Sequence, residues 1–115
     1  MRRGEIRLVD LDPVRGAEAD KRRPAVIVSN DGANLTAQRL GRGVVTVVPV
    51  TSNTANVYPF QVFLAATDTG LDVDSKAQAE QVRSVDVDRI GARVGMLANE
   101  QLVELDEALR LHLAL

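Results

Sequence analysis

The chain has 115 residues, a formal net charge of −2 and 45% hydrophobic residues, which suits a single domain, residues 1–115, with an ordinary core. It contains no cysteine, so disulfides and thiolate metal sites are excluded. No apolar stretch approaches the roughly 20 residues of a membrane span, and no apolar segment follows Met1, Arg2 and Arg3 as in a signal peptide, so we expect a cytoplasmic protein without a membrane partner.

The two parts of the chain differ in charge. Residues 1–42 carry nine Lys and Arg against six acidic residues, whereas residues 43–115 carry five against ten. One end of the protein can therefore face an anion while the other keeps the protein soluble. Random scatter of surface charge explains the same asymmetry equally well, and both interpretations stay open.

The N-terminal part predicts two strands separated by a loop. Residues 5–11 begin with the polar–apolar alternation of a half-buried strand, and residues 13–22 have the composition of an exposed loop. Residues 24–29 read as a buried strand that opens on Pro24, where a proline costs no hydrogen bond of the sheet. We therefore expect Arg23 to be fixed at the mouth of this strand.

The middle of the chain predicts a turn at residues 30–34 and either a helical turn or a loop at residues 35–42. Residues 44–50 give the strongest strand signal, with five valines and a threonine. Pro49 near the end of this segment indicates a sheet edge or a bulge. A polar loop follows at residues 51–56.

The second half predicts short strands followed by one helix. Strands are expected at residues 59–64, around residues 79–83 and at residues 90–96, with a turn at residues 68–72. The leucines that recur at helical spacing toward the C-terminus are Leu102, Leu105, Leu109 and Leu113. Asn99 is the expected N-cap of this helix. This pattern predicts a small curved sheet or open barrel with a packed amphipathic helix.

Several catalytic chemistries are excluded or disfavoured by the residues available. The single histidine, His112, lies in the predicted helix, where a surface or packing role is expected. No His, Asp and Glu cluster has metal-ligand spacing, and no glycine-rich phosphate loop precedes a helix.

A cationic and hydroxylic set remains. Arg23 precedes one predicted strand and Thr51 follows another, so a sheet can bring them together, and Glu18 lies in the loop before Arg23. An arginine can hold a phosphate, a hydroxyl can donate to it, and a carboxylate can accept a proton from a 2′-hydroxyl. These groups suffice for attack by an RNA 2′-hydroxyl on its neighbouring phosphate. A basic loop and an ordinary polar turn explain the same residues, and composition alone favours that simpler interpretation.

Sequence blocks along nearly the whole chain resemble the MazF/PemK family of toxin endoribonucleases of type II toxin–antitoxin systems. The blocks are GEI (4–6) with VDLDP (9–13), RGAE (15–18), RPAVIVSN (23–30), VPVTS (48–52), YPFQV (58–62), EQVRS (80–84) and DEAL (106–109). Each block is weak by itself, but their order and separations match the family.

The resemblance implies a mainly β fold with helices, an SH3-like, partly open barrel (CcdB/PemK-like) that works as a homodimer. It implies an mRNA interferase that cleaves single-stranded RNA at a short sequence without a metal or cofactor and leaves a 2′,3′-cyclic phosphate and a 5′-hydroxyl. The partner it implies is a cognate antitoxin whose acidic, extended tail covers the RNA groove.

The resemblance also implies roles for particular residues. Arg23 matches the catalytic arginine, Thr51 the catalytic threonine and Glu18 a loop acid. Since a guanidinium keeps its proton, Arg23 is expected to stabilise phosphate charge and Glu18 to be the base, although another base stays open. The residues expected to contact RNA are Lys21, Arg22, Ser52, Gln81 and Arg83.

Two positions depart from the family pattern. Arg7 stands where many members carry Tyr or Trp, so base choice or dimer packing is expected to differ. Arg22 stands where a neutral residue or histidine is common, which should steepen the salt dependence of RNA binding.

Alternatives from other functional classes stay open. Toxins of the same architecture bind a protein target such as gyrase and cleave no nucleic acid, and fold does not fix function. An inactive relative is a third reading. The cleavage motif, the antitoxin and the class of RNA cleaved are also left open.

Overall fold

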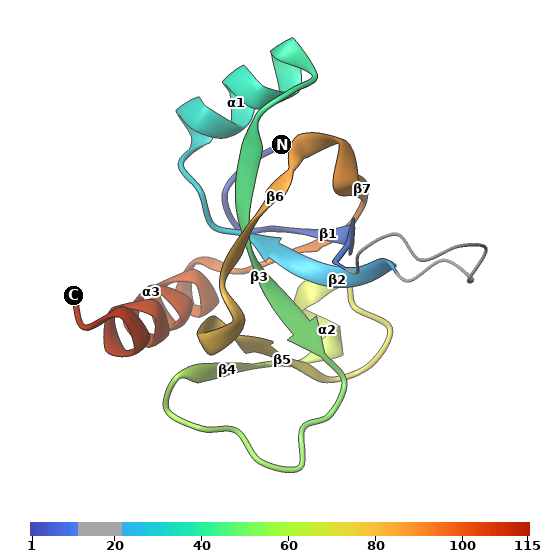
Figure 1. Cartoon of the computed structure of the whole chain (residues 1–115). Helices are drawn as coiled ribbons and strands as arrows, with labels where there is room; N and C mark the ends of the chain where they lie inside the picture. Colours follow the sequence, from blue (N-terminus) through green and yellow to red (C-terminus); the bar gives the residue numbers. More distant parts are fainter. Residues whose placement is uncertain (12–21) are drawn as a thin grey trace.

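The computed structural model describes residues 1–11 and 22–115. Within these ranges, seven antiparallel strands form one curved sheet that does not close, in the order β4-β5-β3-β2-β1-β7 with β6 beside β3 (Figure 1). The strands are β1 (Glu5–Asp10), β2 (Arg22–Ile27), β3 (Val44–Thr51), β4 (Gln61–Leu64), β5 (Ser75–Gln78), β6 (Arg83–Asp86) and β7 (Ile90–Met96). The helices are α1 (Asp31–Leu40), α2 (Ala66–Thr69) and α3 (Asn99–Leu113), with 3-10 turns η1 (Ala79–Gln81) and η2 (Val87–Arg89).

The central strands β2 and β3 are buried on both faces, which explains their continuous apolar sequences. Val26 and Val48 belong to a cluster that includes Leu105 of α3. Ile27 and Val47, which point the other way, belong to a second cluster that includes a buried alanine of α1. The sheet therefore separates two hydrophobic cores, one under each long helix (Figure 1).

Strand β3 changes its partner halfway along its length. Its residues 44–47 pair with β6, and its residues 50 and 51 pair with β5. Pro49 lies between these two sets of pairs, where a missing N–H costs no ladder hydrogen bond. The predicted sheet edge or bulge is therefore a change of partner within a central strand.

Strand β2 begins at Arg22 rather than at Pro24, so the predicted start of this strand was wrong. The reason is that β1 continues to Asp10 and pairs with the cationic residues, in the register Val9↔Arg23 and Asp10↔Arg22. Arg23 is thus part of the strand and does not merely precede it.

The residues expected to form a turn at 30–34 instead begin helix α1. Asn30 is the N-cap, and its Oδ1 accepts a hydrogen bond of 2.8 Å from the backbone N–H of Ala33. Asn, Asp and Gly favour both turns and helix starts, so their composition could not decide between the two. The helix then fills most of the ambiguous segment 35–42.

Three further local predictions were wrong. The strand expected around residues 79–83 is the 3-10 turn η1 between β5 and β6, and α2 occupies the start of the expected turn at 68–72. Ala98 rather than Asn99 is the N-cap of α3, because Gln101 Oε1 accepts the Ala98 N–H at 2.9 Å. Among the described residues, no helix has both the length and the apolar character needed to cross a bilayer.

Helix α3 is expected to contribute to stability mainly through its buried face. Replacing Leu105, which is fully buried in the core, by Ala should lower the free energy of unfolding by about 2–5 kcal/mol because it leaves a cavity. The matched control Val103→Ala, at a side chain 60% exposed on the same helix, should change it by less than about 0.5 kcal/mol. Urea denaturation measures both, and equal effects would contradict the packing described.

Candidate active site

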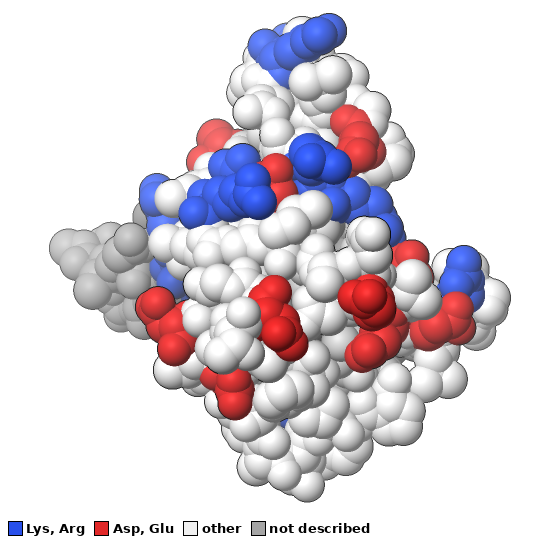
Figure 2. All heavy atoms as spheres, turned by 180° about the vertical axis from the view of Figure 1, so that it is seen from behind, with Lys and Arg blue, Asp and Glu red and all other residues white. Residues whose placement is uncertain are grey.

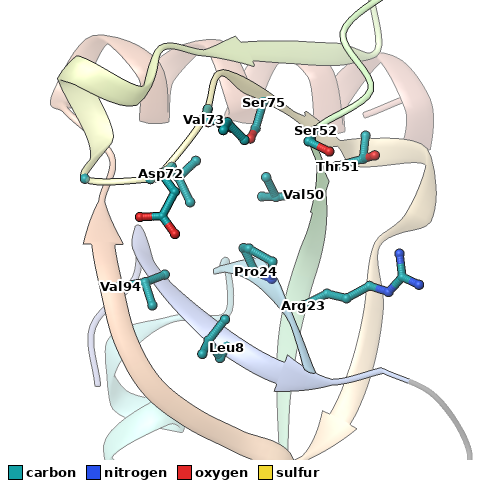
Figure 3. Close-up of a pocket in the computed structure, with 12 residues that line it drawn as sticks. Leu8, Arg23, Pro24, Val50, Thr51, Ser52, Asp72, Val73, Ser75 and Val94 are labelled. Atoms are coloured by element: carbon teal, nitrogen blue, oxygen red, sulfur yellow. Dashed lines mark hydrogen bonds between the residues drawn. The ribbon is translucent and has the colours of Figure 1, made fainter. Parts of the chain in front are cut away.

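A hollow of about 440 Å³ opens where β2 and β3 diverge (Figure 3). Toward this end, the last pair between the two strands is Ala25↔Pro49. Beyond it, β2 continues beside β1 and β3 continues beside β5. The apolar residues that line the hollow are Leu8, Pro24, Val50, Leu71, Val73 and Val94, and the polar ones are Arg23, Thr51, Ser52, Asp72 and Ser75.

The divergence follows from the hydrogen-bond pattern of β2. The N–H of Val28, just after β2, points toward β3 and donates to the carbonyl of Thr46 at 2.9 Å. Because alternate residues of an antiparallel strand face the same neighbour, the nitrogen of Pro24 also faces β3. That nitrogen carries no hydrogen, so the pairing of β2 with β3 has no donor there and the strands separate.

Arg23 and Thr51 lie on the two strands that separate at this opening. Each lies two residues beyond the last pair of the two strands, Ala25↔Pro49, and both line the same edge of the hollow (Figure 3). Arg23 is exposed, and its guanidinium has no hydrogen bond or ion pair within residues 1–11 and 22–115. A strand-held cation that is not neutralised by these residues is suited to binding an anion.

The hydroxyl of Thr51 is oriented by the loop that follows it. Its Oγ1 accepts the backbone N–H of Asn53 at 3.2 Å, which leaves the hydroxyl hydrogen able to donate. Ser52 is exposed at the same edge of the hollow (Figure 3). This edge therefore offers a guanidinium and two hydroxyls to a phosphate.

A buried lysine, which sequence reasoning missed, holds the loop between β3 and β4. Lys76 pairs with Thr51 in the sheet and is only 7% exposed. Its Nζ donates to the carbonyl of Asn56 and lies 5.8 Å from the ring centre of Tyr58, which stacks on Phe60. No sequence signal distinguishes this lysine from an exposed one, since its role depends on a distant loop.

The other described residues that were predicted to contact RNA, Arg22, Gln81 and Arg83, do not line the hollow. Arg22 reaches over Gly91 of β7, where a Cβ would lie 3.1 Å from Arg22 Nη1. Arg83 donates from Nη1 to the carbonyl of Leu11 at 2.8 Å, and Gln81 is exposed in the turn η1. Lys21 and the predicted base Glu18 lie outside the described residues.

Arg7, the position that departs from the family pattern, is engaged within the sheet. Its Nε and Nη2 each lie 2.9 Å from Oε1 of the buried Glu5, and its Nη1 donates to the carbonyl of Gly91 at 3.0 Å. The guanidinium thus ties β1 to β7 and does not reach the hollow.

Charged side chains are unevenly distributed on the face opposite that of Figure 1. Figure 2 shows most Lys and Arg in a band across this face, with a few Asp and Glu within and above it and several more below it. Among the described residues, no three His, Asp or Glu side chains are placed to hold a metal ion together.

Comparison with known proteins identifies the family. The family of PemK-like, MazF-like toxins of type II toxin–antitoxin systems matches residues 2–113. Endoribonuclease MazF9 of Mycobacterium tuberculosis (strain ATCC 25618 / H37Rv) is 66% identical over 115 residues, covering 100% of this chain and 98% of that protein. Endoribonuclease MazF of Staphylococcus epidermidis is 33% identical over 115 residues, covering 100% and 92%.

Solved structures share the fold. MazF (Form-I) from Deinococcus radiodurans superposes with a TM-score of 0.76 at 28% identity, covering 100% of this chain and 97% of that one. MazE–MazF (Form-III) from the same organism gives 0.72 at 25% identity, covering 99% and 96%. The predicted mainly β, partly open barrel with a C-terminal helix is confirmed. The chain belongs to the family of PemK-like, MazF-like toxins of type II toxin–antitoxin systems.

Proposed function

We propose that the protein is a sequence-specific toxin that cleaves single-stranded RNA without a metal ion, leaving a 2′,3′-cyclic phosphate and a 5′-hydroxyl. Endoribonuclease activity, predicted from the sequence, is confirmed by the names of its relatives at 66% and 33% identity. The observation that carries the finer proposal is that Arg23 and Thr51 line one edge of the hollow, where the Arg23 guanidinium has no partner within residues 1–11 and 22–115.

In this mechanism Arg23 and Thr51 stabilise the phosphate as its charge increases. The 2′-oxygen forms a bond to phosphorus while the bond to the 5′-oxygen breaks. Arg23 holds a non-bridging oxygen through its N–H groups, and the Thr51 hydroxyl donates to another. The strands fix the backbone positions of both residues before RNA arrives, and the N–H of Asn53 also holds the Thr51 hydroxyl.

Glu18 is the proposed base in this mechanism. Its carboxylate would take the proton of the 2′-hydroxyl, and the departing 5′-oxygen would take a proton from water. Arg23 keeps its own proton throughout, because a guanidinium does not deprotonate in proteins. The proposal for Glu18 is supported only by its place in the RGAE block of the family.

The proposed partners follow from the family and from the charge of the site. A cognate antitoxin is supported by the solved MazE–MazF complex of Deinococcus radiodurans. An acidic antitoxin segment is expected to compete with RNA because both are anionic and no described residue pairs with the Arg23 guanidinium. A homodimer in the cytoplasm is part of the same proposal.

Replacing Arg23 by Ala should lower the cleavage rate of a long RNA by at least about 100-fold, because one stabiliser of the transition state is lost. The fold should be unchanged, since the guanidinium bonds to none of the described residues. Arg39→Ala, at an exposed arginine on α1, is the matched control and should cleave normally. A near-normal rate for Arg23→Ala in a gel assay would overturn the role of this residue.

Cleavage should continue in EDTA, and the fragments should carry 2′,3′-cyclic phosphate ends. Mass spectrometry of the fragments measures the end groups directly. Activity that disappears in EDTA and returns with magnesium would reject the metal-free mechanism. Intact RNA in both conditions, from folded protein, would instead favour a toxin that binds a protein target.

Replacing Glu18 by Gln should slow cleavage by about 100- to 10,000-fold if the carboxylate accepts the 2′ proton. Glu104→Gln, at an exposed position on α3, is the control for loss of one negative charge. Single-turnover rates at saturating protein separate the chemical step from RNA binding. An unchanged single-turnover rate would leave Glu18 without a role in proton transfer.

A further inference from the structure

The hollow is larger than the phosphate contacts require. Arg23, Thr51 and Ser52 lie at one edge, whereas Asp72 lies at the opposite edge, on the segment between α2 and β5 (Figure 3). An apolar floor separates the two edges; it is formed by Leu8, Pro24, Val50 and Val94. The mechanism proposed above uses only the first edge.

The polar groups away from Arg23 are hydrogen-bond acceptors. The carboxylate of Asp72 has no hydrogen bond or ion pair within residues 1–11 and 22–115. The hydroxyl of Ser75 already donates its hydrogen to the carbonyl of Val73 at 2.9 Å, so its Oγ can only accept from a ligand. This part of the hollow therefore suits a ligand that presents N–H groups, and its negative charge disfavours a second phosphate.

The segment that carries Asp72 is held firmly against β7. Gly70 ends α2 with a φ of 86°, and a Cβ at Gly95 would clash with the carbonyl oxygen of Thr69, so helix and strand pack backbone to backbone. The carboxylate of Asp74 accepts the N–H of Ala66 at 2.9 Å and closes the segment on itself. The position of Asp72 is thus built into the fold before RNA binds.

We propose that Asp72 and the apolar floor form a subsite for the base of a nucleotide next to the cleaved phosphate. This inference rests on the proposed RNA cleavage. The floor contacts the flat face of an unstacked base, and Asp72 accepts a hydrogen bond from its exocyclic amino group. Cytosine, adenine and guanine present such a group, whereas uracil presents its single N–H between two carbonyl oxygens that the carboxylate repels. Asp72 therefore selects against uracil at this nucleotide.

The test is a competition among short RNAs that vary only in the nucleotides next to the cleaved bond. The wild-type protein should prefer an amino-bearing base over uracil at one of these positions by about 5- to 100-fold. Asp72→Asn should remove most of that preference, because an amide can also donate to the carbonyl oxygens of uracil. Asp68→Asn, at an exposed aspartate of α2 that does not line the hollow, should keep the wild-type preference.

A base analogue tests the contact from the RNA side. Replacing adenine by purine, or cytosine by 2-pyrimidinone, removes only the amino group. The analogue should slow cleavage by the wild-type protein and should have little effect on Asp72→Ala. If Asp72 acts only as a surface charge, its substitution will change cleavage of all sequences equally and the analogue will slow every variant alike.

The outcomes separate the two proposals. The subsite is overturned if the Asp72→Asn protein cleaves RNA with an unchanged base preference. It is also overturned if the wild-type protein prefers uracil at these positions. Both results leave the proposed cleavage mechanism intact. A change confined to binding of an antitoxin, with no change in base preference, assigns Asp72 to a protein contact and also overturns the subsite. Wild-type protein that leaves all RNAs intact overturns both proposals.

Discussion

The site depends on the point at which the pairing of β2 with β3 ends. Pro24 turns a nitrogen without hydrogen toward β3, and Pro49 lies where β3 exchanges β6 for β5. Beyond these prolines β2 pairs only with β1 and β3 pairs only with β5, so the sheet opens between β2 and β3. The hollow, with Arg23 on one strand and Thr51 on the other, is the consequence.

The same sheet that opens at one end is tightly fixed at the other. Next to the opening, four residues of β2 and β3 are fully buried. Val26 and Val48 lie on one face of the sheet, and Ile27 and Val47 lie on the other. Buried strands of this kind have few ways to shift, because any slip would expose or overpack both cores. Arg23 and Thr51 therefore need no bond to each other to keep their relative position, and both stay available to a ligand.

The parts of the structure that were predicted from sequence are those that depend on local patterns. Continuous valines predicted β3. Arg23 is fixed as expected, but for a different reason: it pairs with Val9 of β1 within β2, and Pro24 does not begin the strand. The failures concern residues whose environment is made by distant segments. Asn30 caps a helix although the residues around it have the composition of a turn. Lys76 is buried because it bonds to a loop 20 residues away. Asp72 lines a hollow only because β2 and β3 separate on the opposite side.

The two edges of the hollow carry opposite charges. Arg23 and Asp72 line the same hollow but form no ion pair, since an apolar floor separates them. Paired, they would neutralise each other and close the space to any ligand. Kept apart, they attract opposite kinds of group: an anion at the edge formed by β2 and β3, and N–H donors at the edge formed after α2. A nucleotide satisfies both edges in only one orientation, with its phosphate toward Arg23 and its base toward Asp72. The separation of the two charges can therefore orient the RNA chain as well as bind it.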